Sequence, residues 1–241
     1  MKDKMTIADI SQKDLEDLIR ESLTLPKKQA EVPKPLAEAY VVSANKFDLQ
    51  TEKLSEENKQ AHQELMNGYA KALNEVSAAL DSADRENANP NNSNFRNLKM
   101  DEVHNLNAAF LHGMFFENIS DSRSNLSMDS LTYMRLERDW GNFDAWQRDF
   151  IACAMSSRNG WVVTVYNTFL KRYINVVVDL HNVGIPFSSY PVIVLDCWEH
   201  SYYRDYLKDR RSYVFAMMKE LRWSVVEDRI RRVERMAEAA K

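Results

Sequence analysis

The sequence predicts an α+β fold, in which an N-terminal helical hairpin is followed by a mixed lobe with a small three-stranded antiparallel sheet and flanking helices. Three observations support this prediction. Apolar residues recur at helical spacing over residues 54–80, a polar run over residues 82–94 separates them from a second helical pattern, and short β-branched runs appear only after residue 160. A chain of 241 residues with 44% hydrophobic residues can bury a core for these elements.

The hairpin is expected to begin with a long helix that starts after Ser55, a residue type favoured as an N-cap. A polar loop containing Asn89-Pro90-Asn91-Asn92 should follow it, and a second helix is expected over roughly residues 100–117. The apolar face of the first helix is expected to consist of Leu65, Tyr69, Leu73, Val76 and Leu80.

The mixed lobe is expected to open with two helices, over residues 128–138 and 142–157. The pattern then changes period, because β-branched residues gather in short runs separated by turn residues, which favours a small buried sheet. The composition over residues 202–240 is helical again. The three strands, largely antiparallel, are expected at residues 161–166, 173–178 and 192–196.

The chain is expected to divide into an arm at residues 1–50, a helical hairpin domain at residues 51–124 and a C-terminal α/β domain at residues 125–241. Within the arm, residues 5–24 carry apolar side chains near helical spacing among charged ones, which is typical of an amphipathic helix. Residues 25–35 are rich in proline and lysine and favour an extended linker. The arm has no core of its own, so it is a candidate to bind another protein.

Composition and charge limit the possible partners and location. The formal net charge is −4 and charges of both signs are interspersed, so no nucleic-acid or anionic-membrane partner is predicted. The sequence contains no uncharged apolar stretch of membrane-spanning length. Cys153 and Cys197 lie far apart in apolar surroundings, which suits reduced thiols. Residues 1–9 show neither a secretory signal nor an Arg-rich transit pattern, so a cytoplasmic location is expected.

Three of the five histidines, His62, His112 and His200, fall on or beside apolar helical stripes. A charged imidazolium is costly to bury, so each of them needs a partner. Asp196 stands four residues before His200 at the end of a predicted strand, and a buried carboxylate there also needs compensation. Three imidazoles and one carboxylate form a ligand set that suits iron or manganese and leaves a position open for water or a small substrate.

Each of these residues also has an ordinary structural interpretation. A lone histidine on an apolar face is usually a hydrogen-bonded core residue, Asp196 could cap a helix, and Glu199 could be a surface or interface acid. His104 and His181 lie in polar or loop-like sequence and are interpreted as structural. Ordinary aromatic packing would explain Trp198, Tyr202, Tyr203 and Tyr206. The set of possible ligands therefore carries more weight than any one of its members.

A family resemblance becomes specific in the run Asp196-Cys197-Trp198-Glu199-His200-Ser201-Tyr202-Tyr203, with Asp205-Tyr206 and Arg211-Ser212-Tyr213 behind it. This run resembles the C-terminal signature of iron/manganese superoxide dismutases, in which an Asp and a His separated by three residues bind the metal. Residues 107–118 are similar to the second-helix segment of that family. Further landmarks follow in the family order, at Trp140-Gly141-Asn142-Phe143, Gly160-Trp161 and Asn182-Val183-Gly184-Ile185-Pro186. The resemblance covers residues 54–231 and looks closest to a divergent bacterial iron-type branch.

The resemblance implies one iron or manganese ion per chain, held in the C-terminal domain and the hairpin by His62, His112, Asp196 and His200. His62 is the candidate for the first ligand, although it stands seven positions before Tyr69 where the commoner family pattern has eight. Tyr69 would stand over the open face of the metal as a gate and proton donor. The remaining implied residues, around the ligands or at the interface of a homodimer, are Trp198, Glu199 and Tyr203.

The implied activity is that of an iron-type superoxide dismutase, which converts superoxide to dioxygen and hydrogen peroxide. The family ordinarily places a glutamine against the metal-bound solvent, but the expected positions here read Ala108 and Ser156-Ser157-Arg158, and the histidine usual between the first ligand and the tyrosine is replaced near Leu65-Met66. These differences and the arm motivate an alternative, a catalytically lapsed dismutase-like structural subunit of a larger assembly such as a mitochondrial ribosome, in the mitochondrial matrix. Another metal-dependent oxidoreductase on the same scaffold is a third interpretation.

Overall fold

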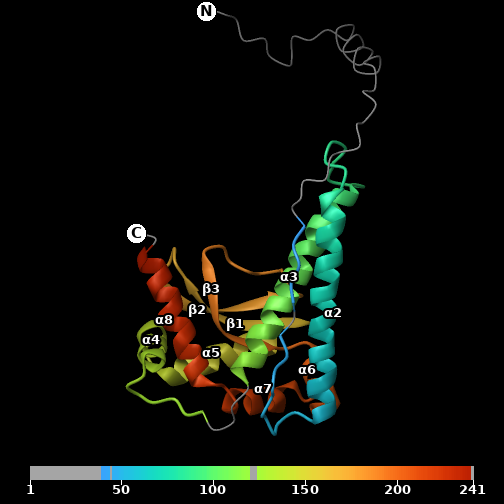
Figure 1. Cartoon of the computed structure of the whole chain (residues 1–241). Helices are drawn as coiled ribbons and strands as arrows, with labels where there is room; N and C mark the ends of the chain where they lie inside the picture. The colour runs from blue at the N-terminus through green and yellow to red at the C-terminus, as the bar shows by residue number, and fades with distance from the viewer. Residues whose placement is uncertain (1–38, 44, 120–123, 240–241) are drawn as a thin grey trace, which may run out of the picture. The chain divides into compact units, whose positions relative to one another are not determined.

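The computed structural model describes residues 39–43, 45–119 and 124–239. The predicted arm helix at residues 5–24 and its linker lie outside these residues. Figure 1 shows the described elements in chain order. They are α2 Glu56–Asp81, α3 Asn94–Asn118, α4 Leu131–Trp140, α5 Phe143–Ser156, β1 Gly160–Asn167, β2 Arg172–Asp179, β3 Ser189–Asp196, α6 Glu199–Tyr206, α7 Arg210–Lys219 and α8 Trp223–Ala239. The predicted α+β fold, with its helical hairpin and mixed lobe, is confirmed.

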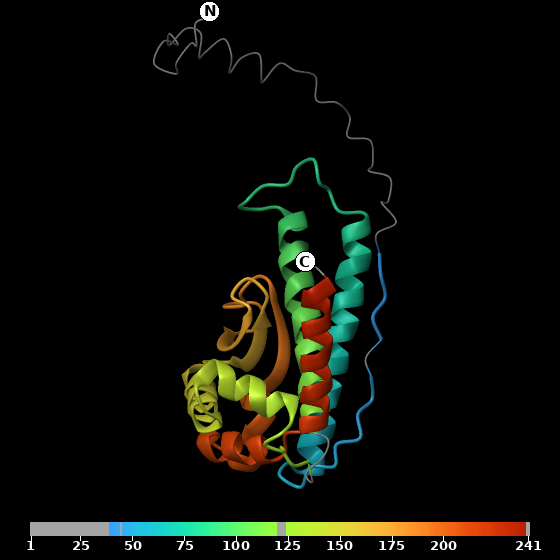
Figure 2. The same ribbon diagram turned by 90° about the vertical axis from the view of Figure 1, so that its left-hand side faces the viewer.

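Helices α2 and α3 form the hairpin and lie side by side, with α3 nearer the sheet (Figures 1 and 2). Ser55 caps α2 as predicted, because its hydroxyl accepts a hydrogen bond from the backbone N–H of Asn58. Helix α3 begins at Asn94 rather than near residue 100, since Ser93 provides a similar cap. The buried face of α2 is also rotated from the predicted one, and Met66 is buried while Leu65 is half-buried.

The three strands form one antiparallel sheet in the order β2-β1-β3. Central strand β1 brings Trp161 opposite Val178 of β2 and opposite Asp196 of β3. A Cβ atom at Gly160 would lie 2.0 Å from the carbonyl oxygen of Val178, so no side chain fits where these two strands meet. This register places the end of β3 beside the start of β1.

Different helices pack against the two outer strands of the sheet. Helices α3 and α8 pack against β3, while α4 and α5 pack against β2, and α5 also contacts β1. The stretch predicted as helical over residues 202–240 is divided into parts of α6, α7 and α8, with a left-handed residue, Leu207 at φ 52°, after α6. None of the described helices is long and apolar enough to span a membrane.

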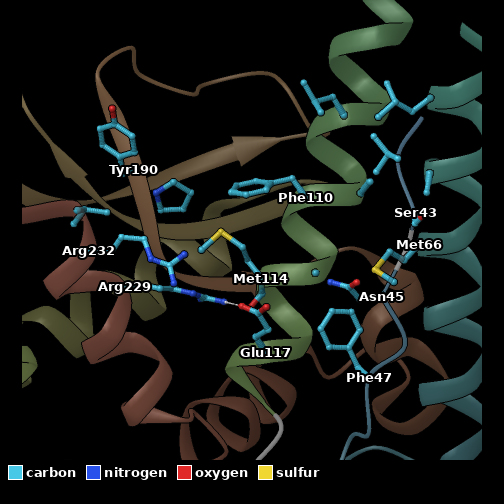
Figure 3. Close-up of a pocket in the computed structure, with 18 of the residues that line it drawn as sticks. Ser43, Asn45, Phe47, Met66, Phe110, Met114, Glu117, Tyr190, Arg229 and Arg232 are labelled. Carbon is cyan, nitrogen blue, oxygen red and sulfur yellow. Dashed lines mark hydrogen bonds and ion pairs between the residues drawn. The ribbon is translucent and has the colours of Figure 1, made fainter. Parts of the chain in front are cut away.

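One buried cation, Arg229 of α8, ties the helices to the sheet. Its guanidinium donates to the carbonyl oxygens of Val192 on β3 and Met114 on α3, to the side-chain oxygen of Asn118 and to the carboxylate of Glu117. Figure 3 shows Arg229 and Glu117 beside a hollow of about 440 Å³ that is lined mainly by apolar side chains. The hollow contains none of the predicted metal ligands. Arg229 therefore belongs to the framework of the fold.

Candidate metal centre

Four side chains converge where the hairpin meets the mixed lobe. His62 comes from α2, His112 from α3, Asp196 from the last position of β3 and His200 from the first turn of α6. One possible ligand atom from each lies within 4.8 Å of the others. The first three residues are at most 2% exposed, and the side chain of His200 is 26% exposed. The structure thus brings together all four residues that the sequence singled out as a set.

A single carboxylate oxygen lies at the centre of this cluster. Asp196 Oδ2 is 3.1 Å from His62 Nε2, 3.2 Å from His200 Nε2 and 3.6 Å from His112 Nε2. The Nε2 atoms of His112 and His200 are 3.4 Å apart. Three nitrogens and one oxygen therefore face a common point, and they come from four separate elements of the fold.

Hydrogen bonds outside the cluster orient the groups within it. Asp196 Oδ1 accepts from the backbone N–H of Trp198 at 2.8 Å, which turns Oδ2 toward the histidines. His112 Nδ1 lies 2.6 Å from the carbonyl oxygen of Ala108, one turn earlier on α3. A carbonyl can only accept, so Nδ1 carries the proton and the lone pair of His112 Nε2 faces the cluster.

The electrostatics of the cluster suit a cation. Burial lowers the pKa of His112 to about 3 and also lowers the pKa of His62, so both imidazoles are neutral at neutral pH. Burial alone would raise the pKa of Asp196, but attraction to His200 and hydrogen bonds with His200 and His62 hold it well below its usual range. His62 Nδ1 is buried and has no hydrogen-bond partner among the described residues. An ionised carboxylate among three imidazole nitrogens is a donor set that fits iron or manganese.

Tyr69 lies beside the cluster, on the same helix as His62. Its ring centroid is 5.4 Å from that of His112, and its hydroxyl oxygen is 3.1 Å from His181 Nε2. Burial and the charge of Asp196 raise the pKa of this phenol, which therefore keeps its proton at neutral pH. The side chain predicted to stand over the metal thus lies next to the cluster and carries a proton.

His181 is the functional candidate that the sequence reasoning missed. The residue lies in a turn, as its loop-like sequence predicted, but it is 0% exposed and contacts both Trp161 and Tyr69. The indole N–H of Trp161 donates to His181 Nδ1 at 3.1 Å, so the neutral ring carries its proton on Nε2 and donates it to the Tyr69 hydroxyl. Burial lowers the pKa of His181 to about 4, which keeps the ring neutral.

The turn after β2 explains how His181 reaches the interior. Asp179 and Val183 exchange backbone hydrogen bonds, and Leu180 between them is left-handed at φ 56° and bonds to the carbonyl of Asn159. The partner of Tyr69 therefore comes from a turn, and not from the positions of Ala108 or Ser157 where the missing glutamine was sought. Ser157 instead donates its hydroxyl hydrogen to the carbonyl oxygen of Ala154. The only sequence signal for His181 was its place beside the family landmark at residues 182–186.

Known proteins were compared with this chain. The family described as iron/manganese superoxide dismutases, C-terminal domain, matches residues 129–229. The superoxide dismutase [Fe] of Aquifex pyrophilus is 33% identical over 177 residues, which cover 72% of this chain and 82% of that protein. The chain belongs to the iron/manganese superoxide dismutase family. A second member, the superoxide dismutase [Mn] 2 of Haloferax volcanii, is 36% identical over 121 residues, or 50% of this chain and 60% of that protein.

The aromatic residues around this dismutase-family cluster have distinct positions. The Trp198 ring stacks on His181, with centroids 5.0 Å apart, and on His200, with centroids 5.7 Å apart. Tyr203 is 54% exposed and Glu199 is also exposed on the surface of the single chain. Trp198 therefore packs around the cluster, whereas the other two residues, predicted to lie around the ligands or at a homodimer interface, are exposed.

Proposed function

We propose that this chain is a superoxide dismutase that uses one redox metal ion per chain, iron in preference to manganese, and is located in the cytoplasm. The observation that carries the proposal is the buried Asp196 carboxylate, which faces three imidazole nitrogens and has no permanently charged partner among them. His62, His112, Asp196 and His200 would hold the metal. When bound, iron or manganese supplies the alternating one-electron oxidation and reduction that turns superoxide into dioxygen and hydrogen peroxide.

The chain's own contribution to this reaction is to deliver protons, because reduction of superoxide to hydrogen peroxide consumes two of them. Tyr69 keeps its phenolic proton and accepts a hydrogen bond from His181 Nε2, which leaves its own hydroxyl hydrogen for another partner. We assign to Tyr69 the role of proton donor at the mouth of the site. His181 and Trp161 fix the position of the phenol oxygen, as outer hydrogen-bond partners do in other metal sites.

The structural-subunit alternative now has less support. It rested on the missing glutamine and on the N-terminal arm. His181 provides a hydrogen-bond partner for Tyr69, which removes the first reason, and the predicted arm helix and its linker lie outside the described residues. The enzyme proposal therefore stands ahead of the alternative.

We also propose a homodimer of a two-domain chain. The hairpin domain at residues 51–124 would supply two ligands and the α/β domain at residues 125–241 the other two. Glu199 is adjacent in sequence to a proposed ligand yet exposed, so a second copy of the chain is its proposed partner. Light scattering should give twice the chain mass, and Glu199→Lys should shift the mass toward one chain. A parent protein that remains a single chain at micromolar concentration would rule out this interface.

The proposed activity is tested by reconstitution. The metal-free chain is loaded separately with Fe²⁺ and Mn²⁺, metal per chain is counted, and superoxide consumption is followed. We expect one ion per chain and activity with iron, and we expect His112→Ala and Asp196→Asn to lose more than about a hundredfold in metal affinity, beyond the usual effect of outer partners. Asp149→Asn, an exposed carboxylate that accepts from Trp140 and Asn175, is the matched control. Iron-loaded parent that consumes no superoxide would support the structural alternative.

A further inference from the structure

His104 on α3 is close to Tyr69 but is not one of the four proposed metal ligands. It is half-buried, and its ring meets those of two neighbours edge to face. Its centroid is 4.7 Å from that of His181 and 6.1 Å from that of Tyr69. Its interpretation as a structural residue in polar surroundings overlooked these two neighbours. His104 is therefore partly exposed to solvent and lies beside the pair that handles the proton.

The proposed reaction requires that Tyr69 recover a proton after giving one away, and His181 is poorly placed to supply it. To donate its Nε2 proton and stay neutral, His181 would have to take up a new proton on Nδ1. That nitrogen already accepts the indole hydrogen of Trp161, which is a donor only, and the ring is fully buried. His181 thus holds the phenol oxygen in place but has no access to a fresh proton.

His112, whose ring also lies beside that of Tyr69, cannot supply this proton either. Its Nδ1 proton is bonded to the carbonyl oxygen of Ala108, and its Nε2 faces Asp196 and His200. In contrast, neither ring nitrogen of His104 has a hydrogen-bond partner within the described part of the chain, and the residue has an exposed side. Of the three histidines whose rings contact that of Tyr69, His104 is the one open to water.

We propose that His104 returns protons from solvent to Tyr69, an inference that rests on the proposed dismutase function. In this step an N–H bond of the His104 imidazolium breaks, one water molecule carries the proton across, and an O–H bond forms on the Tyr69 phenolate. The neutral imidazole then takes a proton from solvent, and no electrons move. Histidine suits this task because its imidazole has two ring nitrogens, and each can carry or accept a proton. The groups facing His104 are Tyr69 from α2 and His181 from the turn after β2.

The test uses His104→Phe, which keeps an aromatic ring for packing but carries no proton, and Asn105→Ala as the neighbouring control. The side chain of Asn105 bonds only within its own helix, to the carbonyl oxygen of Asp101. At equal iron content and saturating superoxide, we expect His104→Phe to lower turnover by about tenfold or more. A tenfold loss is smaller than the usual effect of removing a general acid. Added imidazole should restore turnover in His104→Phe and leave the parent and Asn105→Ala unchanged.

A second measurement does not depend on activity. In the metal-free chain, exchange of the Tyr69 hydroxyl hydrogen with water, followed by NMR, should slow severalfold in His104→Phe. Unchanged turnover and exchange would overturn the role of His104, and so would a slow variant that imidazole does not rescue. If iron-loaded parent has no activity, the proposed function fails, while the exchange measurement still decides whether the proton path runs through His104.

Discussion

Arg229 and Asp196 are both buried and charged, but their charges are compensated by different kinds of partner. The Arg229 guanidinium donates to four oxygens that all belong to the fold, two of them backbone carbonyls. Asp196 Oδ2 faces three imidazole nitrogens, and burial keeps at least His62 and His112 neutral. The first arrangement is complete without a ligand, whereas in the second no partner of the carboxylate carries a permanent charge. Incomplete compensation therefore distinguishes the candidate metal centre from buried polar groups that serve the fold.

The largest effect on folding is expected at Arg229. Arg229→Met leaves the carbonyls of Met114 and Val192 without their donor, so the free energy of unfolding should fall by about 3–5 kcal/mol. Metal bound per folded chain should not change. Urea unfolding with Arg231→Met as the control checks this, because Arg231 is exposed and its bond to Glu227 should contribute less than about 1 kcal/mol. Equal losses in the two variants would contradict the structural role given to Arg229.

His181 is expected to have a smaller effect on stability than Arg229. Both of its ring nitrogens make hydrogen bonds only while the ring is neutral. Burial lowers its pKa from 6.5 to about 4, so the unfolded chain takes up a proton at a higher pH than the folded chain. The stability it contributes is complete above about pH 6.5 and is lost as the pH falls toward about 4. His181→Gln can keep both hydrogen bonds without titrating in this range.

The free energy of unfolding of the metal-free parent should therefore fall more steeply than that of His181→Gln over this window, by at most about 1.4 kcal/mol per pH unit. Urea unfolding at pH 7, 6 and 5 measures the difference. Parallel pH profiles would show that His181 is not held neutral by the fold.

The smallest effect is expected at Glu117, the one charged acceptor of Arg229. Its side chain is 49% exposed, so water can solvate the carboxylate and the ion pair adds little to the free energy of unfolding. Glu117→Gln keeps a side-chain oxygen near the guanidinium and should cost less than about 1 kcal/mol in urea unfolding. A loss as large as that of Arg229→Met would mean that the carboxylate, and not the set of carbonyls, holds Arg229.

The sequence predicted those features that local patterns determine. Helical spacing and the Ser55 cap located α2, and β-branched runs located the three strands, because both signals lie within a few neighbouring residues. His62, His112 and His200 were found because imidazoles on apolar stripes need partners. The inward position of His181 depends on a turn closed by Asp179 and on Trp161 of another strand. A contact between residues so far apart in sequence leaves no local pattern from which it could be predicted.

The most direct test of the central claim is the stability of Asp196→Asn with and without metal. Asparagine can still accept from the Trp198 N–H through Oδ1, while its uncharged amide group can donate to the Nε2 lone pair of His112. We predict that the metal-free variant is at least as stable as the metal-free parent, and that iron raises the unfolding temperature of the parent but not of the variant. A variant destabilised as strongly as Arg229→Met, or still stabilised by iron, would contradict the account.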